Sequence, residues 1–314
     1  MLFKDQDGAP LSPALQDLAK KQQGDTVKAW LIKNCDEINQ KIETLDVIHL
    51  ATPSPSQKPV YTPVPFTNDP PVAPYPKRFG LWGTLFPWVR KRIETENARA
   101  EAEYDDRMNT WRDYKAKHEK SESERRLLLQ ERLYKEPDAM QMVLEQRLQV
   151  IEWPRETIIS LNISEDGKGA VIEVDLPEIE DVPRKTATYG GRGWKVTMKE
   201  LSDTKASQLY MRHVHGIAFR VLGEAFASLP TISEIVLSGY SQRPNKTTGE
   251  ISDEYLYSVR VTREAWSKIN FGNLSAIEVT ESLGQFELRR DMSKNGRFTA
   301  IEPFSRWTEE PGQA

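Results

Sequence analysis

The hydrophobic positions of this chain follow two different periods, and the change occurs near residue 153. Before it, apolar residues recur every three to four positions, the spacing of one helix face. After it, they alternate with polar residues in short runs, which is typical of half-buried strands. One broad helical stripe interrupts those runs. The apolar residues are concentrated in residues 150–305, where we therefore expect the hydrophobic core.

Residues 1–50 predict two short helices that form a hairpin. Ser12-Pro13 can open the first helix, Gly24 can end it, and Asp25 can cap the second. The apolar stripe of the second helix consists of Val27, Leu31, Cys35, Ile38 and Ile42. Cys35 is the single cysteine, which excludes an internal disulfide and a thiolate metal cluster. On this stripe we interpret it as a buried apolar residue.

Residues 51–79 form a proline-rich segment, with nine prolines between Pro53 and Pro76. Such a segment favours extended polyproline II and cannot bury enough apolar area to order itself. We therefore expect a linker that acts as a spacer.

Residues 79–92 read FGLWGTLFPWVRKR, an aromatic run followed by three basic residues. One interpretation is a membrane-surface anchor, with aromatic rings at the interface and cations toward acidic headgroups. The other is a plug docked on the folded domain or on a partner. The run is too short to span a membrane, and its glycines and proline interrupt an amphipathic helix. On the sequence alone we favour the plug.

Residues 88–134 predict a long, highly charged helix with a narrow apolar seam, broken near Lys120–Ser123. The seam residues are Ile93, Ala100, Tyr104, Met108, Trp111 and His118. A seam of this width needs a partner. We expect a second helix from the same chain or another copy, so this arm is the predicted site of self-association or of a protein partner.

Residues 137–305 predict an α+β domain, which begins with a short helix after Pro137 and is followed by a tail, 306–314. Its sheet is expected to be mostly antiparallel and to pack on one long helix, residues 202–229, which carries the broad stripe. Asp166-Gly167 marks a hairpin turn. The predicted strands are 159–163, 170–176, 195–201, 234–239 and 254–262, with an edge strand at 285–289.

The most distinctive stretch is IEVDLPEIEDVP, residues 172–183, which carries five carboxylates. Strand alternation places Ile172, Val174 and Leu176 on one face and the carboxylates of Glu173 and Asp175 on the other. Two like charges this close need water, a cation or a basic partner. The remaining acids of the stretch, which we regard as candidate binding residues, are Glu178, Glu180 and Asp181.

A metal-dependent nuclease is one hypothesis for these acids. A helix, three strands, a helix and a strand is the element order of the restriction-endonuclease core, which holds a divalent metal on its second and third strands. Glu173 and Asp175 would then ligate Mg²⁺, an ion that prefers oxygen ligands. The third strand would supply Lys195, Lys199 and Glu200. The alternative is that the acids accept backbone N–H groups and contacts from Arg184 and Lys185, or face a basic partner.

Two further features have weaker chemical content. Tyr189–Trp194 is glycine-rich and contains Arg192, so it could cradle a phosphate, but it precedes a strand and lacks a helix dipole. Arg192 and Trp194 are therefore candidate binding residues on what we interpret as a connection. His213 and His215 are two positions apart on a predicted helix and point in opposite directions, so they cannot share one metal.

A net charge of −4 and a pI near 5.8 do not indicate a general electrostatic grip on nucleic acid, although local basic patches remain possible. Seven stretches resemble an uncharacterised family of bacterial proteins, some of which have a short N-terminal domain of unknown function. The resemblance covers roughly residues 80–305 and implies a bacterial, cytoplasmic setting, without an activity. The stretches are ENARAEAEYD, VIEWPRETI, DLPEIEDVPR, LYMRHVHGIAFR, VLSGYSQRP, DEYLYSVRV and QFELRRDM.

We therefore expect a non-catalytic cytoplasmic interaction protein without a cofactor, of the kind found as a component of bacterial multi-gene systems such as phage defence. The second hypothesis, from a different class, is the Mg²⁺-dependent nuclease or another nucleic-acid-directed enzyme built on Glu173 and Asp175.

Overall fold

The computed structural model of the protein describes residues 10, 12–155, 157–190, 195–244 and 251–305. The chain divides into two compact units. Unit 1 contains Met1–Lys58 and Glu136–Ala314, and unit 2 is Pro59–Lys135. Unit 2 is thus inserted in the sequence of unit 1. The N-terminal helix therefore belongs to the same unit as the C-terminal α+β fold, a division that differs from the sequence-based one.

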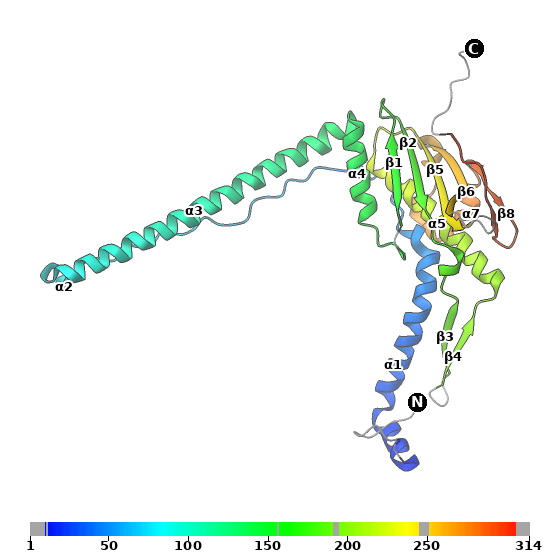
Figure 1. The fold of residues 1–314 in the computed structure, drawn as a ribbon, viewed down its shortest axis with the longest axis horizontal. Coiled ribbons are helices and arrows are strands. Elements are labelled where there is room, and N and C mark those ends of the chain that lie inside the picture. The colour runs from blue at the N-terminus through cyan, green and yellow to red at the C-terminus, as the bar shows by residue number, and fades with distance from the viewer. Residues whose placement is uncertain (1–9, 11, 156, 191–194, 245–250, 306–314) are drawn as a thin grey trace. The chain divides into compact units, whose positions relative to one another are not determined.

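Unit 1 is built on a five-stranded sheet in the order β1-β2-β5-β6-β7 (Figure 1). Three of its pairings are antiparallel, and the central pair, β2 with β5, is parallel. The expected mostly antiparallel α+β fold is therefore confirmed. The edge strand predicted at 285–289 is also present. The strands are β1 (Ile159–Ile163), β2 (Gly169–Asp175), β5 (Glu234–Pro244), β6 (Ile251–Thr262) and β7 (Glu287–Arg289).

The long helix α5 (Asp203–Ser228) carries the core of unit 1. Ser202 caps it as expected, with its hydroxyl accepting the N–H of Lys205. Eighteen of its 26 residues are buried, because the sheet and other helices cover most of its surface. α4 (Pro137–Gln149) contacts both α5 and β1. Asp166 and Gly167 form the predicted turn between β1 and β2, where Gly167 has a φ of +65°.

α1 (Pro13–Val47) is one continuous helix that runs through Gly24, so the predicted helical hairpin is wrong. One glycine costs a helix about 1 kcal/mol, which its neighbours can offset. With the following 3₁₀ turn η1 (Ile48–Ala51), α1 packs on α5. Ile48 lies where a side chain at Gly216 would stand, which explains the close approach.

A separate two-stranded sheet joins β3 (Lys185–Gly190) to β4 (Lys195–Glu200). β3 was missed at the sequence level. Asn39 of α1 holds this hairpin, because its amide accepts the N–H of Ala187 and donates to the Ala187 carbonyl, both at 2.9 Å. The acidic stretch before β3 contains the 3₁₀ turn η3 (Ile179–Asp181).

The C-terminal part of unit 1 covers the second face and the edge of the main sheet. Phe304 lies with Val171 and Val236 in a small apolar cluster, and its N–H donates to Ser258 Oγ at 3.0 Å. The guanidinium groups of Arg260 and Arg289 lie over its ring. The remaining elements are α6 (Arg263–Trp266), η4 (Phe271–Ala276), α7 (Val279–Leu283), β8 (Asp291–Met292) and β9 (Phe298–Thr299).

Unit 2, which we call the arm, consists of an extended segment and a long helix that lie side by side (Figure 1). The segment, residues 59–78, is named the strap. The helix α3 (Pro87–Gln130) has 44 residues and is roughly 66 Å long at 1.5 Å per residue. The predicted break at Lys120–Ser123 does not occur. A short helix α2 (Gly80–Leu85) joins strap to α3, and the 3₁₀ turn η2 (Arg132–Tyr134) follows α3.

The strap runs antiparallel to α3 and contacts the stripe that we assigned to a partner helix. Trp111 Nε1 donates to the Asn68 carbonyl at 2.8 Å, and Phe66 packs against the rings of Trp111 and His118. Nearer the tip, Asn97 clamps both backbone groups of Lys77. The proline-rich segment, which was not expected to order itself, is thus held in place by contacts with α3. No helix among the described residues is long and apolar enough to cross a membrane.

Candidate functional site

The acidic end of β2 lies where the alternation predicted. Ile172, Val174 and Leu176 are buried, whereas Glu173 and Asp175 are half-buried on the opposite face. Tyr255 of β6 donates its hydroxyl to Glu173 Oε1 at 2.9 Å. Glu173 therefore has a neutral hydrogen-bond partner from the same sheet.

Burial and neighbouring carboxylates perturb the pKa values of side chains at this end of β2. Burial raises the pKa of Asp175, and the negative charge of Asp253 raises it further, against an opposing effect of Arg155. Burial, together with the hydrogen bond and charge of Glu173, raises the pKa of Tyr255 to about 12. Within the described residues, no group of three or more His, Cys, Asp and Glu side chains is arranged to hold a metal ion.

Lys195, Lys199 and Glu200 are not beside these carboxylates in the sheet. They lie on β4, which pairs with β3 in the separate hairpin, whereas β2 pairs with β1 and β5. The expectation that the strand at 195–201 belongs to the main sheet is therefore wrong. The chain turns away at η3, and the missed strand β3 becomes the partner of β4.

The other acids of the stretch have local roles. The backbone N–H of Glu178 donates to Asp181 Oδ2, and the Glu178 side chain accepts the N–H of Asp181 in return, which forms a capping box around η3. Asp181 also forms an ion pair with Arg155. Glu180 is exposed. Arg184, one of the two cations expected to neutralise these acids, instead forms an ion pair with Asp203 at 2.7 Å.

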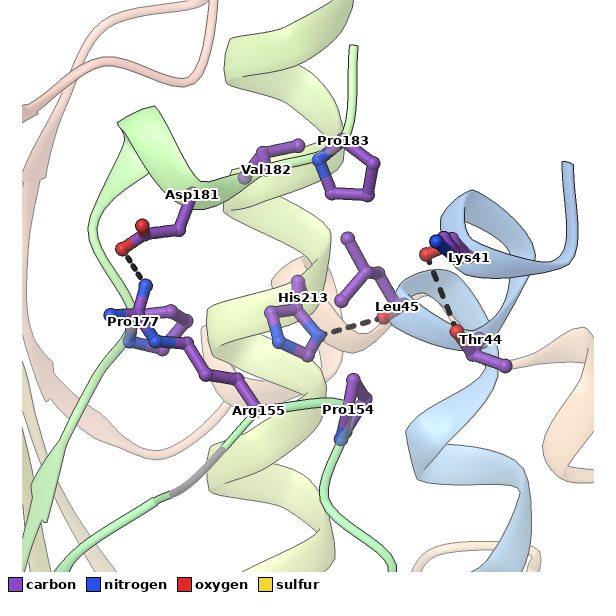
Figure 2. Close-up of a pocket in the computed structure, with 10 residues that line it drawn as sticks. All are labelled: Lys41, Thr44, Leu45, Pro154, Arg155, Pro177, Asp181, Val182, Pro183 and His213. Carbon is purple, nitrogen blue, oxygen red and sulfur yellow. Dashed lines mark hydrogen bonds and ion pairs between the residues drawn. The ribbon is translucent and has the colours of Figure 1, made fainter. Parts of the chain in front are cut away.

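A cavity of about 400 Å³ in unit 1 lies beside this ion pair. Figure 2 shows the Asp181 carboxylate turned toward Arg155 and the His213 ring turned toward α1. Its wall is largely apolar. The lining residues are Lys41, Thr44, Leu45, Pro154, Arg155, Pro177, Asp181, Val182, Pro183 and His213.

His213 is held neutral at this cavity. Its Nδ1 donates to the Leu45 carbonyl at 2.9 Å, which leaves Nε2 as a hydrogen-bond acceptor. Burial lowers the pKa of His213 to about 4, although the Leu45 carbonyl and Asp46 act in the opposite direction. His215 faces a different environment, between Met211 and Arg290, as the predicted divergence requires. The cavity can accept a small hydrogen-bond donor, but its one ion pair is internally neutralised.

The predicted phosphate cradle cannot be placed. Arg192 and Trp194 lie outside the described residues, as does most of the glycine-rich connection between β3 and β4.

The most unusual surface of the described residues is the arm tip, residues 79–89. Pro87 forces Phe86 into an extended conformation, with φ −124° and ψ 108°, so the aromatic run divides between α2 and the start of α3. Phe79 packs against Gly83, where an added side chain would meet the Phe79 Cβ at 3.0 Å.

The large side chains of the tip point into solvent. Leu81 is 82% exposed, Trp82 70%, Leu85 68% and Trp88 67%. Trp82 stacks on Phe86, with ring centroids 5.9 Å apart, so the rings form one cluster. These are the side chains that the docked plug expected from the sequence would bury, and that interpretation stays a prediction.

Three consecutive basic residues, Arg90, Lys91 and Arg92, follow the cluster in the sequence. Arg90 lies over the ring of Phe79 and forms an ion pair with Glu94, and Arg92 forms an ion pair with Glu96. Residues 70–93 contain five basic residues and no acidic residue. The sequence did identify this run, but only the structure shows that it forms an exposed turn at the end of the arm.

No protein family, no curated protein and no solved structure matches the chain. The functional argument therefore depends on the geometry of the molecule itself.

Proposed function

We propose that this chain is a non-catalytic interaction protein that uses the arm to present the tip, residues 79–89, to a binding partner. The observation that carries this proposal is the cluster of four large apolar side chains, each at least two-thirds exposed, on a helix turn that α3 and the strap support. Exposed apolar clusters of this kind mark interaction sites.

The design of the arm supports the same proposal. The strap occupies the stripe of α3 that would otherwise need a second helix, so the arm has its own internal packing. Because the strap covers the apolar stripe of α3 and the apolar side chains of the tip are exposed, we expect a partner to bind at the tip.

The nuclease hypothesis has less support. It needs Glu173 and Asp175 to meet a third acid and a lysine from a neighbouring strand. In the structure, the Glu173 carboxylate accepts the Tyr255 hydroxyl, and the candidate residues of β4 belong to another sheet.

Site-specific photo-crosslinking tests the proposal. The full chain carries a photoreactive phenylalanine analogue at position 82 in bacterial cells, and the matched control carries it at position 30, where Trp30 is 52% exposed on α1. The expected result is a defined adduct from position 82 that position 30 does not form. Equal, diffuse labelling from both positions contradicts the proposal, as does no adduct from either.

A further inference from the structure

We propose that the partner of the arm tip is an anionic lipid surface, into which the tip inserts without crossing it. This inference rests on the proposed function and identifies the partner of that same surface. Three features of the tip favour a bilayer over a protein: the residue types, the charge pattern and the small size.

The residue types match the interfacial layer of a bilayer. Trp82 and Trp88 are amphipathic rings of the kind enriched where hydrocarbon meets headgroups. Leu81 and Leu85 provide aliphatic area between them, and both are more than two-thirds exposed. An interfacial helix buries its apolar face about 5–10 Å below the headgroups.

The charge pattern favours anionic lipid in particular. Lys77, Arg78, Arg90, Lys91 and Arg92 are the charged residues of the 24-residue stretch 70–93. Lys77 and Arg92 share Glu96, and Arg90 pairs with Glu94, so the five cations outnumber the two carboxylates that they contact. This positive excess stands on a chain whose net charge is −4. A basic group near an anionic membrane contributes about 1 kcal/mol, which is roughly fivefold in affinity.

The tip is small, because α2 has only six residues. A stable protein interface buries about 800 Å² on each partner, and a single short helical turn reaches that area only by entering a deep pocket. A bilayer surrounds an inserted tip from all sides and needs no matching pocket. The supported turn also keeps its rings exposed before binding, so insertion costs little conformational entropy.

The backbone of the tip is compatible with insertion. The C-terminal end of the α2 backbone is hydrogen-bonded within the turn, from the Phe86 N–H to the Trp82 carbonyl at 3.0 Å. The Thr84 hydroxyl donates to the Leu81 carbonyl at 2.7 Å and is therefore satisfied as well. These two groups therefore keep their hydrogen-bond partners when the turn leaves water.

Vesicle co-sedimentation of the full chain tests this inference. The probes are vesicles of phosphatidylcholine with phosphatidylserine and vesicles of phosphatidylcholine alone. We expect binding to the anionic vesicles and at least tenfold weaker binding to the neutral ones. Trp82→Ala with Trp88→Ala should weaken binding on the order of a hundredfold, since each buried ring contributes about a factor of ten.

The charge and control variants separate the two contributions. Arg78→Gln with Lys91→Gln should weaken binding on the order of tenfold and reduce its dependence on salt. Trp30→Ala, which removes an exposed indole from α1, should bind like wild type. Circular dichroism melts that match wild type establish that each variant is folded.

Three outcomes overturn the inference. The first is no binding to anionic vesicles. The second is binding that the Trp82/Trp88 variant retains. The third is tip-dependent self-association in sedimentation velocity without vesicle binding, which assigns the tip to a second copy. If position 82 still crosslinks to a protein while vesicles do not bind, the proposed function stands and only the lipid assignment fails.

Discussion

Arg263 is the residue that closes the end of α5. Its guanidinium donates to the carbonyls of Phe226, Leu229 and Ile232 at 2.5–3.0 Å and lies over the Phe226 ring. A helix leaves its last four carbonyls unsatisfied, and Leu229 and Ile232 continue beyond the end of α5. One arginine of α6 thus donates hydrogen bonds to three carbonyls at the end of α5 and in the connection to β5.

Arg263→Ala should lower the free energy of unfolding by about 2–4 kcal/mol, because several carbonyls lose a charged donor at once. Arg263→Lys should recover only part of the loss, because a single ammonium does not reproduce the planar fork. Chemical denaturation of the full chain measures both values. The control is Arg99→Ala, which removes an exposed i,i+4 ion pair with Glu103 and should cost under about 0.5 kcal/mol. Similar costs for Arg263→Ala and Arg99→Ala would contradict this role.

Substituting Asp175 should stabilise the protein, unlike substituting Arg263, because the pKa of Asp175 is raised in the folded state. A carboxyl of this kind binds its proton more tightly when folded, so its charge destabilises the protein above its folded pKa. Asp175→Asn should therefore raise the melting temperature at pH 7. The gain should shrink as the pH falls through the raised pKa and vanish below the ordinary value of 3.8. Thermal melts from pH 7 to pH 3.5 test the direction.

Glu173 and Asp175 also allow a test of whether this site binds a divalent metal ion. If Glu173 and Asp175 bind no catalytic metal, Mg²⁺ and Mn²⁺ should leave the melting temperature of the wild type unchanged. A saturable increase that Glu173→Gln with Asp175→Asn abolishes would instead promote the nuclease hypothesis, because a ligand stabilises the state that binds it.

The strap and α3 act as one element, and Glu122 is their main polar junction. Its carboxylate accepts the N–H of Val64 at 2.9 Å and the hydroxyl of Tyr61, and it pairs with Arg125, which donates to the Thr62 carbonyl. These hydrogen bonds lower the pKa of Glu122 to about 2, Arg125 being the largest cause. An extended proline-rich chain makes no internal backbone hydrogen bonds, so its order depends on groups of this kind.

Glu122 should hold the strap above pH 4.5, its ordinary value, and should release it as the pH falls through about 2. Glu122→Ala should loosen the strap already at pH 7, seen as faster hydrogen exchange at the Val64 amide with α3 still helical. Glu124→Ala is the matched control, because Glu124 is an exposed glutamate that pairs only loosely with Lys120 at 3.9 Å. Unchanged exchange in Glu122→Ala would refute the junction.

At the scale of the whole molecule, α1 belongs to unit 1 although unit 2 separates it in the sequence from the rest of that unit. His213 and Arg212 of α5 contact Leu45 and Asp46 of α1, and a side chain at Gly223 would collide with Thr52. Removing residues 1–58 exposes this face of α5. The stability of the α+β domain predicted at residues 137–305 therefore has to be compared with that of a chain that keeps α1.

A fragment of residues 136–305 should melt at a clearly lower temperature than the full chain, or without a cooperative transition. Replacing residues 59–135 by a flexible Gly/Ser linker of about 20 residues should preserve the cooperative melt, because unit 2 is a separate compact unit. Calorimetry of both chains measures this. An equally stable fragment would show that α1 is dispensable.

The sequence by itself determined the elements whose signal is local. Period-two alternation in 170–176 placed Glu173 and Asp175 opposite Ile172 and Val174, and the broad stripe of α5 identified the core helix. The Asp166-Gly167 turn and the edge strand β7 followed from turn chemistry and position. Each depends on neighbours in the chain, which a pattern records directly.

Only the tertiary structure decided what covers each face. The seam of α3 was visible in the sequence, but a period shows that a face is buried and not what buries it. The covering strap contributes carbonyls and an N–H to side chains 40 to 60 positions away, and its prolines give no periodic signal. The hairpin β3–β4 likewise lies outside the main sheet and contacts α1, where Asn39, 148 positions from Ala187, binds it. Contacts at such separations depend on the packing of the whole chain, so no local pattern could have revealed them.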